Sequence, residues 1–121
     1  MKARLLDDSL RLRLSRSEVA EVAAGESVIN RTRFPGGTSL QFVLGHHAAS
    51  QWQARIANNV VHIDAPSQSL VQWARGDDVS INAVLAVASD ASLTILVEKD
   101  FACLTARAGD EDCFPHPADD H

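Results

Sequence analysis

Alternating hydrophobic and polar residues give the clearest pattern in the first part of the chain. Residues 10–14 read Leu-Arg-Leu-Arg-Leu, a period of two that is typical of a strand with one buried and one polar face. Ser15 and Glu18 follow in the S-x-x-E pattern, in which each side chain can bind the other residue's free backbone N–H. We therefore predict a short helix over residues 16–24, ended by Gly25.

The same kind of pattern predicts eight strands and two helices in all. The other strands are expected at residues 2–6, 27–34, 39–44, 52–57, 60–63, 79–87 and 92–101. A second helix is predicted over residues 67–75, ended by Gly76. Turn sequences such as Pro35-Gly36-Gly37 and Asn58-Asn59 favour hairpin connections. We predict an α+β fold that is mainly antiparallel, with a strongly curved sheet or partial barrel and two short helices, and no internal repeat is evident.

Length and composition narrow the class of protein. The 121 residues are 45% hydrophobic and carry a net charge of −5, which is typical of one folded domain. We expect this domain at residues 1–105, followed by an acidic, irregular C-terminal tail at 106–121. No run of about 18 apolar residues and no signal-peptide pattern is present, so no membrane partner is expected. The two cysteines and a pI near 5.4 favour a cytoplasmic location.

Charge is distributed unevenly along the chain. Residues 1–33 hold seven basic and five acidic residues, whereas residues 100–121 hold one basic and six acidic residues. Many of the basic residues lie on predicted strands at a spacing of two, which places those of one strand on the same face of the sheet. If these strands pair as neighbours, several guanidinium groups converge on one surface. Together with Lys2, the candidate ligand-binding residues are Arg4, Arg11, Arg13, Arg31, Arg33, Arg55 and Lys99.

Such a cluster predicts a site for an anion, because arginine binds carboxylates and phosphates through two parallel hydrogen bonds. The alternative is an ordinary solvated sheet face, on which arginines limit aggregation. Aromatic residues make up 5% of the chain and are absent from residues 10–14, so nucleic-acid binding is not favoured. The core is predicted to hold the larger aromatic residues Trp52, Trp73, Phe34, Phe42 and Phe101.

The C-terminal region offers a second kind of chemistry. Cys103, Cys113 and His116, with His121, could bind zinc, although their spacing C-x9-C-x2-H-x4-H matches no common zinc motif. One alternative is that Cys103 is a small buried hydrophobic residue and Cys113 a free thiol. A disulfide between Cys103 and Cys113 is less favoured, because a cytoplasmic location is reducing. Apart from zinc, no cofactor is expected.

A third candidate is the pair His46-His47, placed in a predicted loop. A general base there would need an acid or nucleophile as partner, for which Ser50, Asp64 or His62 can be nominated without further support from the sequence. The chain contains no G-x-S-x-G, H-E-x-x-H, P-loop or G-x-G-x-x-G motif, so an enzyme is not favoured.

Three blocks of sequence resemble a family of small bacterial proteins that has no assigned function. They are the opening K-x-R-L followed by S-L-R-L-R-L-S-R-S-E-V, the late stretch L-V-E-K-D-F-A-C-L, and the final E-D-C-F-P-H-P. The resemblance implies a compact domain that spans nearly the whole chain, and it implies no activity.

These observations predict a non-catalytic binding or interaction module whose basic sheet face receives an anionic small molecule or an acidic protein segment. The acidic residues of 110–120 are a further candidate for covering that face. The alternative function is a zinc-binding protein or small metal-dependent enzyme built on the C-terminal Cys and His residues. A homodimer is compatible with either function.

Overall fold

The fold consists of two four-stranded sheets and two helices. The structure is a computed structural model that describes residues 1–101 and residue 114. The first sheet has the strand order β1-β2-β8-β7 and is made of β1 (Lys2–Leu6), β2 (Ser9–Leu14), β7 (Ser80–Ala88) and β8 (Ala91–Lys99). The second sheet has the order β3-β4-β6-β5 and is made of β3 (Val28–Arg33), β4 (Ser39–His47), β5 (Gln53–Ala57) and β6 (Val60–Pro66). The helices are α1 (Arg16–Ala23) and α2 (Ser67–Arg75).

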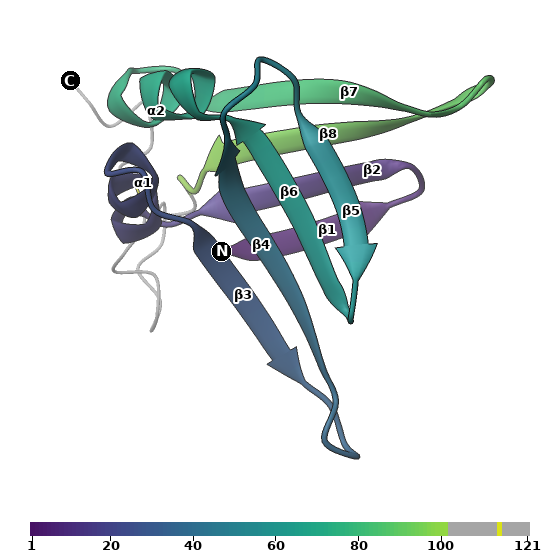
Figure 1. The fold of residues 1–121 in the computed structure, drawn as a ribbon. Coiled ribbons are helices and arrows are strands. Elements are labelled where there is room, and N and C mark those ends of the chain that lie inside the picture. The colour runs from purple at the N-terminus through teal and green to yellow at the C-terminus, as the bar shows by residue number, and fades with distance from the viewer. Residues whose placement is uncertain (102–113, 115–121) are drawn as a thin grey trace.

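Both sheets are mixed in strand direction. Each consists of two antiparallel hairpins joined by a parallel central pair, β2 with β8 in the first sheet and β4 with β6 in the second. The predicted α+β class and the excess of antiparallel pairing are confirmed. A strongly curved sheet or partial barrel is not confirmed, because the chain divides its strands between two sheets that diverge from each other (Figure 1).

The local sequence explains the helices. Ser15 and Glu18 form the predicted capping box at the start of α1: the Glu18 backbone N–H donates to Ser15 Oγ, and Glu18 Oε1 accepts from the Ser15 backbone N–H at 2.9 Å. Helix α1 ends at Ala23, one residue before the predicted end, and α2 has the predicted bounds Ser67–Arg75. The helices pack against each other at one end of the molecule (Figure 1).

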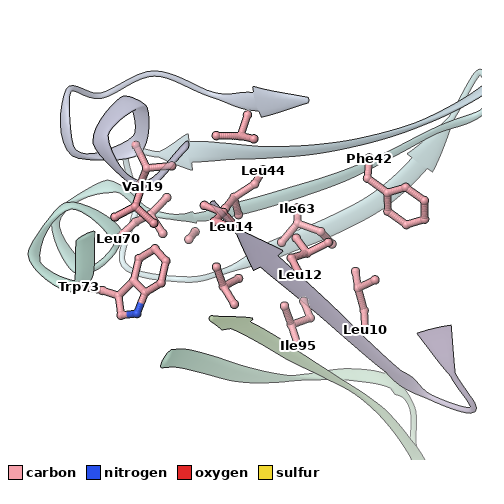
Figure 2. Packing of buried hydrophobic residues seen from close by; sticks show 14 residues of the cluster. Leu10, Leu12, Leu14, Val19, Phe42, Leu44, Ile63, Leu70, Trp73 and Ile95 are labelled. Carbon is pink, nitrogen blue, oxygen red and sulfur yellow. The ribbon is translucent and has the colours of Figure 1, made fainter. Parts of the chain in front are cut away.

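The hydrophobic core lies between the inner faces of the two sheets and under the helices (Figure 2). Strand β2 contributes the alternate residues Leu10, Leu12 and Leu14, which are at most 3% exposed. Trp73 and Phe42 are buried as predicted. Phe34 is not, because it follows β3 at a hairpin tip beyond the core and is 51% exposed.

The order of elements repeats. Both halves of the chain run hairpin–helix–hairpin, and each sheet combines one hairpin from each half. Buried residues of the first hairpin and helix have buried counterparts 51 positions later. These pairs are Leu12 and Ile63, Leu14 and Ala65, Val19 and Leu70, and Val22 and Trp73.

The second hairpins of the two halves, β3–β4 and β7–β8, correspond at a spacing of 53 residues. Phe42 of β4 lies opposite Val61, and Ile95 of β8 lies opposite Leu10, which is the residue equivalent to Val61. The prediction that the chain contains no internal repeat is therefore wrong. Most of these equivalent positions share hydrophobic character but not the same amino acid, so the repeat is not visible in the sequence.

Candidate functional site

Four cationic side chains gather on the outer surface of the first sheet. Lys2 and Arg4 of β1 lie directly opposite Arg13 and Arg11 of β2 in the antiparallel register. Cross-strand partners share one side of a sheet, and here that side is opposite the buried leucines of β2. We call the surface formed by Lys2, Arg4, Arg11 and Arg13 the basic face.

Strand β8 places one carboxylate beside the two central arginines. The parallel register sets Glu98 opposite Arg13, and Glu98 Oε1 lies 2.5 Å from Arg13 Nε and 3.8 Å from Arg11 Nε. The arginine side chains remain about two-fifths exposed, at 39% for Arg11 and 43% for Arg13. Glu98 therefore orients these guanidinium groups and leaves much of their surface accessible.

At the edge of the basic face, the positive charges of Lys2 and Arg4 are only partly balanced by carboxylates. Lys2 Nζ lies 3.1 Å from Asp100 Oδ2, while Arg4 has no salt bridge to any described residue. Counted over the described residues, four cations against two carboxylates leave an excess of positive charge on this surface. A hollow of about 110 Å³ is lined by Lys2, Ala3, Arg4, Arg11 and Arg13.

The other predicted arginines lie elsewhere. Arg31 and Arg33 of β3 and Arg55 of β5 belong to the second sheet, so these three candidate residues do not join Arg4, Arg11 and Arg13 on the basic face. The reason is the division into two sheets, which the sequence does not reveal. Glu98 was not among the predicted site residues, because its position beside Arg13 depends on the non-local pairing of β2 with β8.

Lys99, the seventh predicted ligand residue, is not on the basic face. It is 7% exposed, its Nζ donates to the Gly76 carbonyl at 2.8 Å, and it lies 5.5 Å from the centre of the Trp73 ring. A cation at this position interacts favourably with the carbonyl end of α2. Burial lowers the pKa of Lys99, and the carboxylates of Asp77 and Asp78 oppose that change.

This lowered pKa predicts a dependence of stability on pH. Above its folded-state pKa but below the usual value of 10.5, Lys99 is neutral in the folded protein and still protonated in the unfolded chain. Its contribution to the free energy of unfolding therefore rises with pH in that window and is lost as the pH falls. Urea unfolding between about pH 7 and about pH 10 should show wild type gaining stability relative to Lys99→Met. Parallel pH profiles of the two proteins would contradict the prediction.

The histidine pair lies in a strand rather than in the predicted loop, because β4 extends to His47. Adjacent residues of a strand point to opposite sides, so the two imidazoles do not converge. His46 Nε2 lies 3.1 Å from the Glu26 carbonyl, to which it must donate, and Nδ1 lies 3.0 Å from Ser67 Oγ. His46 is equivalent to Lys99 in the other half of the chain, and both contact a carbonyl just after a helix.

The predicted metal ligands Cys103, Cys113 and His116 lie outside the described residues, as do the acidic residues expected to cover the basic face. Within residues 1–101 and 114, no group of three or more His, Cys, Asp or Glu side chains is placed to hold a metal. In that same part of the chain, neither helix is long and apolar enough to cross a membrane.

Comparison with protein families assigns the chain to a family. A model described as a family of unknown function, DUF7009, matches residues 1–118. Comparisons with curated proteins and with solved structures find no match.

Proposed function

The chain belongs to DUF7009, a family of unknown function, and we propose from its own surface chemistry that it is a non-catalytic binding module whose basic face receives an acidic segment of another protein. The observation that carries this proposal is the set of four cations facing one another across β1 and β2. Arginine pairs at this spacing suit carboxylates, which accept two parallel hydrogen bonds from one guanidinium.

Comparison of the two halves of the chain supports a functional origin for these charges. The positions equivalent to Arg11 and Arg13 in the second half are His62 and Asp64, on the same strand of the repeated unit. The repeated fold therefore accommodates a histidine or an aspartate there. The basic residues on β2 are therefore not required for this fold to form.

The size of the hollow favours a segment over a metabolite. Small-molecule pockets typically enclose about 300–1,000 Å³, whereas the hollow on the basic face holds about 110 Å³. That space suits one carboxylate-sized group at a time. An extended acidic chain can place successive carboxylates along the strands, where each gains a separate contact.

The proposal is tested by binding of a fluorescein-labelled decaglutamate peptide, followed by fluorescence anisotropy at low and moderate salt. Arg11→Gln with Arg13→Gln should raise Kd about tenfold or more, because two charge-assisted contacts are lost. Arg31→Gln with Arg33→Gln removes the same charge from the second sheet and should change Kd about twofold or less. Glu98→Gln should tighten binding by freeing both arginines.

Thermal melts establish that each variant is folded before its affinity is compared. Equal weakening by the two double variants would show that net charge alone controls binding and would overturn the assignment to the basic face. Unchanged affinity in the Arg11 and Arg13 double variant would overturn it as well, as would the absence of saturable binding by wild type.

A further inference from the structure

The tip of the β3–β4 hairpin carries two arginines and an exposed phenylalanine beside a hollow. We propose that it binds a nucleoside monophosphate, with the phosphate held by Arg31 and Arg33 and the base stacked on Phe34. This site is independent of the basic face, which lies on the other sheet.

The register of the hairpin brings the two arginines together with hydroxyl groups. Arg31 pairs with Gln41 and Arg33 with Ser39, and the backbone N–H of Phe34 donates to the Thr38 carbonyl at 2.8 Å to close the turn. A hollow of about 260 Å³ lies at this tip. It is lined by Arg31, Arg33, Phe34, Gly37, Thr38 and Ser39.

The charge of the hollow is not balanced by an ion pair within the described part of the chain. Neither Arg31 nor Arg33 forms a salt bridge with a described residue, in contrast to Arg11 and Arg13, which share Glu98. Two guanidinium groups with adjacent Thr and Ser hydroxyls supply the donors that a phosphate dianion accepts. A dianion would therefore meet donors without having to displace a bound carboxylate.

Phe34 adds a surface for an aromatic ring. Half of its area is exposed, although a phenylalanine of a small domain is ordinarily buried. Bases stack on such exposed rings because every base presents a π-face. The hollow is slightly smaller than typical ligand pockets, a size that suits one ring with one phosphate.

The corresponding hairpin of the second half lacks all three features. At a spacing of 53 residues, Arg31, Arg33 and Phe34 correspond to Val84, Ala86 and Val87 of the β7–β8 hairpin. A hairpin of this fold forms without arginine or an aromatic residue at its end. Arg31 and Arg33 on β3, and Phe34 just after it, are therefore not required for the hairpin to form.

The test is calorimetric titration of the folded protein with AMP, adenosine and inorganic phosphate. Wild type should bind AMP saturably, inorganic phosphate more weakly, and adenosine without detectable saturation. Arg31→Gln with Arg33→Gln should weaken AMP binding about tenfold or more. Phe34→Ala should weaken AMP binding and leave phosphate binding unchanged, since the ring contacts only the base.

Arg11→Gln with Arg13→Gln is the matched control and should bind AMP as wild type does. Loss of AMP binding in that control, equal affinity of Phe34→Ala and wild type for AMP, or no AMP binding by wild type would each overturn the proposal. The decaglutamate experiment uses a different ligand and is decided by Arg11 and Arg13, so the two proposals fail separately.

Discussion

Replacement of Leu12 by alanine is expected to lower the free energy of unfolding by about 3–5 kcal/mol. Leu12 lies on β2, a central strand of the first sheet, and its side chain is fully buried between the two sheets (Figure 2). Truncation removes buried apolar surface and leaves a cavity, because strands on both sides are held by their hydrogen-bond ladders and relax only in part.

The neighbouring residue on the same strand provides the control. Arg11→Ala changes the opposite face of β2, where the side chain is 39% exposed and its ion pair with Glu98 is long, at 3.8 Å. Its cost should be about 1 kcal/mol or less. Urea denaturation of the two variants measures the contrast, and a loss below about 1 kcal/mol for Leu12→Ala would contradict the packing described for the core.

Replacement of Trp73 by alanine should cost a similar amount, about 3–5 kcal/mol. Trp73 lies on α2, is 3% exposed, and joins the helix pair to the core beneath it (Figure 2). Its loss also removes the ring beneath Lys99. The midpoint of thermal unfolding should fall accordingly, while the far-UV circular dichroism of the folded protein stays close to that of wild type.

The variant Trp73→Phe keeps an aromatic ring at this position but removes the indole N–H, so it measures the contribution of that group. The indole Nε1 is buried and has no hydrogen-bond partner among the described residues, so its removal forfeits no hydrogen bond. We expect a loss of about 1–2 kcal/mol, due only to the smaller volume of phenylalanine. If Trp73→Phe destabilised the protein as strongly as Trp73→Ala, the indole N–H would be making an interaction that the structure does not contain.

The two proposed sites differ in how strongly their charges are held in place. On the basic face, Glu98 and Asp100 restrain three of the four cations. At the β3–β4 hairpin, two arginines stand beside an exposed aromatic ring without such restraint. The first arrangement suits repeated contacts along an extended partner, and the second suits a single compact ligand.

Local sequence determined most of the elements. The alternation in residues 10–14 identified β2 and its buried leucines, and the Ser15–Glu18 pair located the start of α1, because both signals depend on residues only a few positions apart. The Asn58-Asn59 turn also forms as predicted, with φ angles of 53° and 63°. The basic character of β2's outer face follows from the same alternation.

Only the tertiary structure decided how the hairpins combine. The parallel pairing of β2 with β8 joins residues some 85 positions apart, and it sets Glu98 beside Arg13. The parallel pairing of β4 with β6 assigns Arg31 and Arg33 to a different sheet from Arg11 and Arg13. The burial of Lys99 and Phe34 was likewise not predictable from the sequence. Lys99 is charged but lies buried under a helix, whereas Phe34 is aromatic but lies exposed at a turn. Sequence periodicity shows which residues share a face, but the identity of the neighbouring strand depends on packing between distant segments.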